Sequence, residues 1–571
     1  MANIIKYIVL ILVFLFASTS FAANVYIDPD CGTNGDGSSG VTCGANGPKN
    51  TIVGVSFSAS NDYYWKCGTT DTIASTRTIS GITATSENRM TLGAYYVDET
   101  EQIGVSGNKP ILNLTNTAAS GFYLAASDYL HFTNLDIRGG YKLFQIGTGG
   151  AAGDVDNLLM ENCIIGKDTI QYGIYAYAPT GSENEDWEIK NNVFDSDIDA
   201  SAASPADEGG ALQDAIDLRG GNTGWLIHDN EFINWPHGAV AFESLSTNAD
   251  VSYNEVYDNT ITITSTLWTF FRAFNINGNT SNHHNKIYRN YIQDTSVRSQ
   301  FSGVDNEVYY NVWNTVNPIR LLSTVDSQGF IVGTKCSLGL TCITQRNKYY
   351  NNTIIDASCG GIYITVSGQS SPTIRSETTD NIIANNIIYN SGKSFGDSAW
   401  PYLDNGGLLL AKRESGEDIS VYDNIIVNNL VYNDETADTF IVQNWLYSEA
   451  QSTSMTASEF NALNGTDGNT ISNNIAGDPD FTTPGSDFTL STGSPAINAA
   501  LITYTSTPDI AGTTVPQGAG ADIGAYEYET FIKKIMNYFR RLRGDNGITQ
   551  DNQAAHQNAL AQVQEHLAQR P

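Results

Sequence analysis

Residues 226–244 read LIHDNEFINWPHGAVAFES and hold three short apolar-alternating runs. The first two, LIH and EFINW, meet across a bare Asp229-Asn230 corner, and the third, AVAFE, follows a Pro-His-Gly turn at 236–238. Strands this short cannot form a stable sheet by themselves, so they must share a buried face with neighbouring segments. The stretch therefore predicts a fold in which short strands stack on further copies of themselves.

A corner of the same kind, with Asn as its second residue, recurs along most of the chain. The copies are ENCII (161–165), NNVF (191–194), DNEF (229–232), DNTI (258–261), RNYI (289–292), YNVW (310–313), NNTII (351–355), NNII (385–388), DNII (423–426) and NNIA (473–476). Successive copies are 21 to 50 positions apart. A unit of about twenty residues with variable insertions is typical of a solenoid.

The chemistry of the corner favours one solenoid class. Asn tolerates the left-handed backbone conformation of a sharp bend, and its amide can bond neighbours in the coils above and below. Short β-branched and aromatic strands fit a parallel stack with a shared inner face. A propeller or sandwich would need regular Asn-Gly or Asp-Gly hairpins, and these are few. We therefore predict an all-β chain with a right-handed parallel β-helix from about 119 to 476.

The first residues indicate export. Lys6 precedes the apolar run YIVLILVFLFA at 7–17, and small residues stand one and three positions before a cut after Ala22. A run of this length falls short of the roughly 20 residues that span a bilayer. We therefore expect residues 1–22 to be a signal peptide and the mature protein to be secreted, outside the cell or at its surface.

Composition and cysteines agree with an exported, folded protein. The chain has 61 Asp and Glu against 29 Lys and Arg, so it lacks the basic excess that nucleic-acid binding requires. Seven cysteines are present. Cys336 and Cys342 bracket a short loop, and Cys31, Cys43 and Cys67 share a Gly-rich stretch, which predicts one or two disulfides. The remaining two are expected in the core.

The C-terminal 42 residues differ from the rest. After Glu529 the sequence FIKKIMNYFRRLRG places apolar residues at helical spacing among basic ones, and a second helical run follows. A short helical tail could dock on the acidic body, attach to a membrane surface or mediate oligomerisation. The predicted division is then a signal peptide (1–22), an N-terminal cap and first coil entry (23–118), the β-helix (119–476), a closing segment (477–529) and the tail (530–571).

Two groups of motifs resemble a known superfamily. VYIDPDCGTNGDGSSG (25–40), TLGAYYVDET (91–100) and YLHFTNLDIRGG (129–140) look like the entry cap and first coil of pectin-lyase-like β-helix proteins. GDPDFTTPGSDFTLSTGSPAINAA (477–500) and ADIGAYEY (521–528) look like their closing segment. The resemblance implies caps at both ends and a polysaccharide partner. The superfamily also contains lyases, hydrolases, epimerases, tailspike depolymerases and non-catalytic surface proteins, so it implies no single activity.

Catalytic motifs of the subfamilies are missing, so a site must be argued from position. The chain has no RxPxxR, no NTD…DD…GHG…RIK set and no DPHD motif. Strand alternation points Ala215, Asp217 and Arg219 outward, and Ala241 and Glu243 one coil later. With Asp217, Arg219 and Glu243 as the catalytic centre, we place His237 at the rim. His283 and His284 are expected in the corresponding loop of the next coil.

The same alternation extends this face along the stack. It turns outward the expected substrate-binding residues Tyr175, Tyr177, Asn275, Asn277, Arg320 and Tyr363. Tyrosine rings offer flat surfaces to sugars, amides bond hydroxyls, and Arg pairs with uronate carboxylates. The alternative is an ordinary polar outer face whose charges pair for solubility.

Three functions fit these groups. A lyase would neutralise a uronate with Arg219, or with Ca²⁺ held by Asp217 and Glu243, and remove a proton with a basic side chain. A glycoside hydrolase would pair Asp217 with Asp214 or Glu243 as acid and base. A non-catalytic, tailspike-like rod would only bind glycans. The arginine content favours β-elimination of an acidic polysaccharide.

Overall fold

The structure is a computed structural model, and part of the chain is described in it. The described residues are 22–115, 120–147, 154–169, 171–178, 181–196, 214–235, 237–243, 250–262, 272–277, 280–293, 299–314, 330–332, 342–357, 361–364, 376–391, 407–413, 419–434, 440–446 and 449–529. The predicted signal peptide (except Ala22), the helical tail at 530–571, Arg320 and Cys336 lie outside them. They remain predictions.

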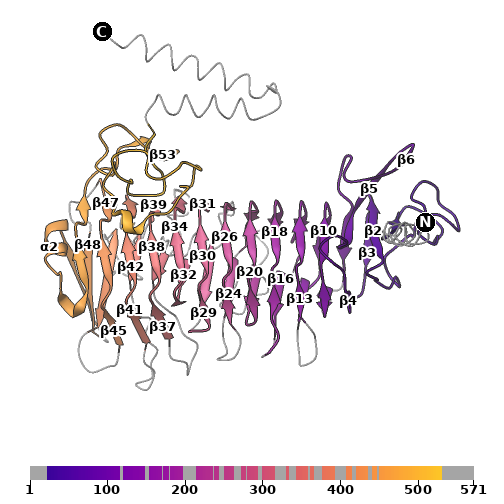
Figure 1. Ribbon diagram of the computed structural model, residues 1–571, viewed down its shortest axis with the longest axis horizontal. Coiled ribbons are helices and arrows are strands. Elements are labelled where there is room, and N and C mark those ends of the chain that lie inside the picture. Colours follow the sequence, from indigo (N-terminus) through magenta and orange to yellow (C-terminus); the bar gives the residue numbers. More distant parts are fainter. Residues whose placement is uncertain are drawn as a thin grey trace, which may run out of the picture.

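Four stacked parallel sheets build the body, and Figure 1 shows their strands side by side along the long axis. Sheet 1 contains β1 (Ala23–Ile27), β2 (Asn61–Lys66), β5 (Met90–Asp98), β10 (Leu130–Thr133), β14 (Leu159–Glu161), β18 (Glu188–Lys190), β22 (Leu226–His228), β26 (Glu255–Tyr257), β30 (Lys286–Tyr288), β34 (Glu307–Tyr309), β38 (Lys348–Tyr350), β42 (Ile382–Ala384), β46 (Ile425–Val427) and β50 (Thr470–Ser472), with β6 (Thr100–Ile103) antiparallel to β5. Sheet 2 contains β3 (Thr70–Ile73), β7 (Ile111–Leu114), β11 (Asp136–Gly139), β15 (Ile164–Ile165), β19 (Val193–Asp195), β23 (Glu231–Ile233), β27 (Thr260–Thr262), β31 (Tyr291–Gln293), β35 (Val312–Asn314), β39 (Thr353–Ile355), β43 (Ile387–Tyr389), β47 (Leu430–Tyr432) and β51 (Ile475–Ala476).

Sheet 3 continues around the turn, and sheet 4 completes it from β17 onward, after the short parallel pair of β9 (Ser127–Asp128) and β13 (Val155–Asp156). Sheet 3 contains β4 (Arg77–Ser80), β8 (Ser120–Ala125), β12 (Lys142–Ile146), β16 (Tyr172–Tyr177), β20 (Asp214–Arg219), β24 (Gly238–Glu243), β28 (Phe274–Asn277), β32 (Ser299–Phe301), β36 (Phe330–Val332), β40 (Ile362–Ile364), β44 (Leu408–Arg413), β48 (Phe440–Leu446) and the antiparallel β49 (Glu449–Met455). Sheet 4 contains β17 (Asn184–Glu185), β21 (Asn222–Thr223), β25 (Val251–Ser252), β29 (Asn282–His283), β33 (Gly303–Val304), β37 (Cys342–Gln345), β41 (Ser376–Thr379) and β45 (Ile419–Tyr422). The predicted parallel β-helix is thereby confirmed.

One turn of the coil explains the stretch at 226–244. Leu226–His228 is β22 of sheet 1, Glu231–Ile233 is β23 of sheet 2 and Gly238–Glu243 is β24 of sheet 3. Each pairs in parallel with the same strand of the following coil. The three runs therefore lie on three faces of one turn.

The Asn residues between sheets 1 and 2 form a buried ladder, which we call the first ladder. Its members are Asn192, Asn230, Asn259, Asn290, Asn311, Asn352, Asn386, Asn429 and Asn474. Asn230 is typical: its Nδ2 donates to the Ile189 carbonyl at 2.8 Å and to Asn259 Oδ1 at 3.1 Å, and its Oδ1 accepts two bonds from Asn192. The amides thus satisfy backbone groups that the corner leaves unpaired.

Three details of the expected corner are wrong. The left-handed residue is the one before the ladder Asn. At two corners this residue is not Asn or Asp but Arg289 (φ 53°) and Tyr310 (φ 53°). The ladder Asn is therefore required for the hydrogen bonds of its amide and not for the bend. Asn162 has φ 55° and is itself the left-handed residue, with Cys163 at the ladder position. Asn424 lies in a different corner, and Asn429 is the first-ladder residue of that coil.

A second ladder, between sheets 4 and 1, was not predicted. Its members are Asn254, Asn285, Asn306, Asn347, Asn381, Asn424 and Asn469. The bonding pattern repeats that of the first ladder, with Nδ2 of Asn347 donating to Asn381 Oδ1 and to the Gly303 carbonyl. In the turns that carry both ladders, the corners before and after the sheet 1 strand have two residues each. This constant length holds the register of the sheet 1 strands.

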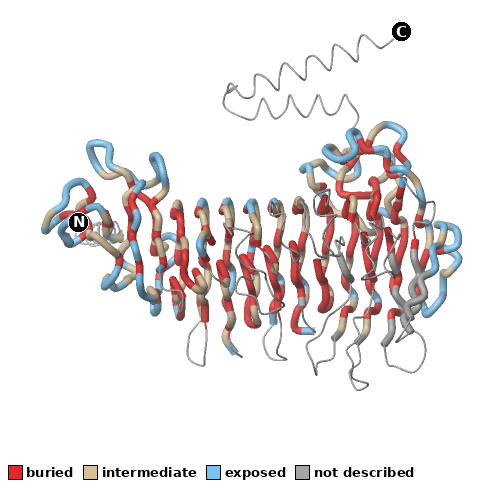
Figure 2. Tube along the Cα trace, turned by 180° about the vertical axis from the view of Figure 1, so that it is seen from behind, coloured by how far each residue is buried: buried red, intermediate tan, exposed pale blue. Residues whose placement is uncertain are grey.

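Apolar side chains fill the inside of the coil, and Figure 2 shows buried residues along its whole length with exposed ones concentrated at the two ends. Stacking continues from coil to coil: the Trp187 and Trp225 rings lie 4.1 Å apart, and Phe194 and Phe232 lie 4.9 Å apart. Cys163 belongs to this core, as predicted.

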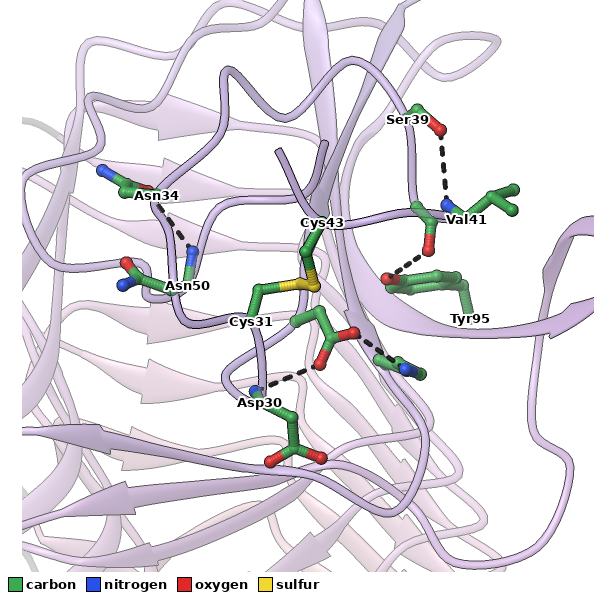
Figure 3. Close-up of a disulfide and its surroundings, with 11 residues drawn as sticks. Asp30, Cys31, Asn34, Ser39, Val41, Cys43, Asn50 and Tyr95 are labelled. Atoms are coloured by element: carbon green, nitrogen blue, oxygen red, sulfur yellow. Dashed lines mark hydrogen bonds and ion pairs between the residues drawn. A yellow bond between two sulfur atoms is a disulfide. The ribbon is translucent and has the colours of Figure 1, made fainter. Parts of the chain in front are cut away.

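The segment between β1 and β2 packs Ile52 into the core of the coil. Cys31 and Cys43 form a disulfide in this segment (Figure 3), which confirms one of the expected disulfides, while Cys67 is a free thiol. The Tyr95 hydroxyl donates to the Gly40 carbonyl at 3.3 Å and ties the segment to sheet 1.

At the C-terminal end of the coil, α2 (Ala457–Asn461) buries Phe460 against Phe440 of β48 at 4.8 Å. The 3-10 turns η3 (Thr466–Gly468) and η4 (Ile502–Tyr504) and the β52–β53 hairpin (Phe481–Thr483, Asp487–Leu490) complete the regular elements described there. Residues 477–529 lie along the flank and not over this end, packing on Val312, Ile355, Ile387 and Leu430 of sheet 2. Among the described residues, no helix is long and apolar enough to span a membrane.

Candidate functional site

Three neighbouring strands of sheet 3 bring the predicted catalytic residues together. Register pairs Tyr175 of β16 with Asp217 of β20, and Arg219 of β20 with Glu243 of β24. Connections before and after the strands of sheet 3 vary in length, whereas the corner between sheets 1 and 2 has two residues from β10 to β51. In solenoid proteins, loops of variable length are concentrated on the face that carries the functional site, so we expect the site on sheet 3.

Arg219 is the centre of this cluster. Its Nε donates to Asp217 Oδ2 at 2.8 Å, and its Nη2 lies 2.8 Å from Glu243 Oε2 and donates to the Tyr172 hydroxyl at 3.2 Å. Asn275 Nδ2 donates to Glu243 Oε1 at 3.2 Å from the next coil. One guanidinium therefore joins two carboxylates from adjacent coils, and 25% of its side chain remains exposed.

Several residues expected on an open surface are buried. Asp217 and Asn275 are 0% exposed and Glu243 is 8% exposed. Burial raises the pKa of Asp217 well above its ordinary value, and the nearby carboxylates of Glu243 and Asp214 add to the effect. Burial also raises the pKa of Glu243. The expectation that these positions are exposed was wrong, because alternation gives a side chain's direction but not what covers it.

Asp217 carries an unusual oxygen. Its Oδ2 is bonded to Arg219, but Oδ1 is buried without a hydrogen-bond partner in the described part of the chain. An orphaned buried oxygen favours the protonated carboxyl group, which agrees with the raised pKa. Asp217 is therefore placed to hold Arg219 and not to touch a substrate.

A break in alternation adds residues that the sequence did not predict. Ala215 was expected to point outward, but it lies in the core beside Ile216, and Ala239 lies in the core beside Val240 in the same way. The N–H groups of Ala239 and Val240 both donate to the Ala273 carbonyl, while the register of β20 and β24 is the same on both sides of this point. The side chain that precedes these two core residues on each strand therefore points outward, toward the cluster around Arg219.

Asp214 is one such residue. It is 0% exposed and accepts from His237 Nδ1 at 3.0 and 3.1 Å. Asp214 raises the pKa of His237, so the ring is held protonated to a higher pH. A Cβ at Gly238 would lie 2.6 Å from Asp214 Oδ1, so glycine makes room for this carboxylate.

Lys142 and Tyr172 occupy the equivalent position on β12 and β16, and both were missed. Lys142 Nζ lies 3.5 Å from the centre of the Tyr175 ring and 5.3 Å from that of Tyr172. Arg219 Cζ lies 5.4 Å from the Tyr175 ring centre. Burial lowers the pKa of Lys142, and the charge of Arg219 lowers it further. The face thus presents two cations on a half-buried tyrosine.

The other predicted binding residues are spread out. Tyr177 is half-buried beside Arg219, whereas Tyr363 is 7% exposed and lies four strands beyond β24. Asn277 pairs with Glu243 through the strand register, but its side chain lies outside the described residues. His283 and His284 were expected near His237. They lie instead at the corner between sheets 4 and 1, because they follow β28 rather than precede it.

The residues present do not fit the expected Ca²⁺. Asp217 and Glu243 both direct an oxygen at Arg219, whose guanidinium takes the position a cation would need. The one group of three ligand side chains in the described residues, Asp28, Cys31 and Cys43, contains the disulfide.

Solved structures similar to this chain exist, but they do not identify its functional residues. No family model matches the chain, and no curated protein matches it. Similar solved structures include pectate lyase Pel9A (13% identity, 90% of this chain and 98% of that chain, TM-score 0.38), the catalytic domain of a GH87 α-1,3-glucanase in complex with nigerose (14%, 67%, 64%, 0.40) and the Dettilon tailspike protein (11%, 57%, 60%, 0.36). At these identities and scores, no residue role is transferred from them.

Proposed function

We propose that this protein binds an acidic polysaccharide on the outer face of sheet 3 and cleaves it by β-elimination. The observation that carries the proposal is the pair of partly exposed cations, Lys142 and Arg219, held on the Tyr175 ring. A ring stacks on a sugar face, and a guanidinium pairs with a uronate carboxylate. A cationic patch on a chain with formal net charge −32 favours an acidic ligand at this place.

The proposed roles follow from the charges of the side chains. Arg219 pairs with the uronate and stabilises the negative charge that develops when C5 loses its proton. Burial lowers the pKa of Lys142, which increases the fraction of the protein in which its amine is neutral and can take that proton. The C4–O bond breaks as the C4=C5 double bond forms, and His237, whose pKa is raised, protonates the leaving oxygen.

Hydrolysis by paired carboxylates is less well supported. Asp214 and Asp217 are both fully buried, so neither expected pair presents two carboxyl groups to a substrate. A glycan-binding rod would use the same face without a proton transfer. We also propose export, which the N-terminal apolar run and the Cys31–Cys43 disulfide support.

One experiment separates these functions. The purified protein is incubated with a panel of uronans and neutral glycans, while ultraviolet absorbance of a conjugated double bond and reducing ends are followed. Elimination gives both signals on a uronan alone. Reducing ends without absorbance would establish hydrolysis, and binding without either would establish the rod.

The variant Lys142→Gln tests the assigned base. It should lose turnover while still binding the glycan, because the glutamine cannot take a proton. Lys348→Gln is the control, since Lys348 is an outer lysine paired with Glu307 on sheet 1 and should keep full activity. Full activity of Lys142→Gln would overturn the proposed role.

A further inference from the structure

Two adjacent histidines outside the proposed active site direct nitrogen atoms at each other. His283 ends β29, and His284 follows it in the left-handed corner conformation with φ 56°. Their Nδ1 atoms lie 2.9 Å apart, and the ring planes are nearly perpendicular at 89°. The pair lies at the corner between sheets 4 and 1, so it belongs to neither sheet 3 nor the proposed reaction.

The other ring nitrogen of His283 faces a carboxylate. Its Nε2 lies 3.4 Å from Asp250 Oδ2, which comes from the preceding coil. In the neutral tautomer whose Nε2–H points toward this carboxylate, Nδ1 carries a lone pair. This arrangement, with one ring nitrogen on a carboxylate and the other free to bind, is the usual one for a metal-binding histidine.

The surroundings hold the pair in place and favour a cation. The Tyr253 ring stacks on His284 with centres 5.0 Å apart and meets His283 edge-on at 5.8 Å. Asp305, at the same corner of the next coil, is already paired with Arg346, which donates to its two oxygens at 2.8 and 2.7 Å. The carboxylate that faces the pair is therefore Asp250 from the coil before, while Tyr253 and His284 remain exposed.

The spacing selects a kind of metal. Two nitrogens 2.9 Å apart, each at a bond length of about 2.0–2.1 Å, subtend about 90° at a shared ion. That angle fits the square-planar or tetragonal geometry of Cu²⁺ and Ni²⁺ and is well below the angle of tetrahedral Zn²⁺. Imidazole suits copper, and Cu²⁺ binds a given site more tightly than Ni²⁺.

We propose that His283 and His284 form a two-nitrogen site for Cu²⁺, with Asp250 positioning His283 and water completing the coordination. Binding displaces the proton shared between the two Nδ1 atoms, which moves to Nε2 of His284, so that both imidazoles bind the ion in their neutral form. Because bound metal stabilises the folded state, Cu²⁺ should also raise the melting temperature.

The test uses the full chain without an affinity tag, titrated with Cu²⁺ and followed by calorimetry and electron paramagnetic resonance. One equivalent should bind with hyperfine splitting from two imidazole nitrogens, and Zn²⁺ should bind more weakly. His283→Gln and His284→Gln should each abolish this signal, and Asp250→Asn should weaken affinity about 10- to 100-fold.

His228→Gln is the matched control. His228 is also partly exposed, bonds Asp229 and stacks on Tyr257, but it lies at the other corner of sheet 1. It should leave copper binding unchanged. Absence of binding to the unaltered chain, or binding that persists when both His283 and His284 are replaced, would show that the pair is only hydrogen-bonded and would overturn the proposal.

Discussion

Replacing Asn230 by aspartate changes one amide of the first ladder into a carboxyl group of nearly the same size. Asn230 is 2% exposed, and its Nδ2 donates to the Ile189 carbonyl and to Asn259 Oδ1. Asn230→Asp removes both donors: the Ile189 carbonyl loses its bond from the side chain, while Asn259 Oδ1 keeps its bond from the backbone N–H of residue 230. At about 1–3 kcal/mol for one unsatisfied buried group, the free energy of unfolding should fall by about 1–3 kcal/mol, before any cost of burying charge.

Asn191→Asp is the matched control, because it makes the same chemical change one corner earlier. Asn191 is exposed in the left-handed conformation, and Asp229 and Asp258 hold the same position in the next two coils. We expect a change within about 0.5 kcal/mol. Solenoids can unfold in parts, so hydrogen exchange of β22 and β23 amides should accompany denaturant titration. Equal effects of the two variants would refute the ladder as the stabilising element.

Three further predictions concern the site and the C-terminal segment. Arg219→Ala should lower stability by about 3 kcal/mol at neutral pH, since it removes the donor of Asp217 and leaves the buried Glu243 carboxylate without its cation; the loss should be smaller in acid, where Glu243 is protonated, and chemical denaturation at two pH values checks this. A chelator should leave turnover unchanged, because Arg219 fills the position between the two carboxylates; loss of activity that Ca²⁺ restores would contradict it. Burial raises the pKa of Asp509 to about 6 and of Glu527 to about 7. The protonated carboxyl groups therefore stabilise the folded state, and this stabilisation is full below their ordinary pKa values and is lost as pH rises toward 7. Hydrogen exchange of residues 509–528 should therefore quicken over this range, and Glu527→Gln should remove the part near pH 7.

The expected effect of Arg219→Ala differs from what the sequence alone implies. If Arg219 and Glu243 were exposed, their removal would leave the fold unchanged within about 0.5 kcal/mol. In the structure Glu243 is 8% exposed and Asp217 is fully buried, so Arg219 has a structural as well as a proposed chemical role. Lys142 is the cleaner probe of catalysis because it is half-buried and the described residues give it no ion pair.

The site was predicted in part. Alternation placed Asp217, Arg219 and Glu243 on neighbouring strands, which the register confirms. It missed Lys142, Tyr172 and Asp214, because two consecutive core residues near the start of each strand break the two-residue period that alternation assumes. A run of two consecutive small or apolar residues after the first strand position, such as Ala215-Ile216, is the signal that would have indicated the break.

The sequence by itself determined the repeat and hence the fold. Corner Asn residues and short β-branched strands recur through the chain, and because every coil packs only on its neighbours, this local pattern suffices to specify a parallel β-helix. Only the tertiary structure decided which Asn belongs to which of two ladders, because both corners have similar local sequences. It also decided which outward side chains are buried, since coverage and hydrogen bonding between coils arise from residues 21 to 48 positions apart. The pairing of His283 Nε2 with Asp250, one coil earlier, has the same origin.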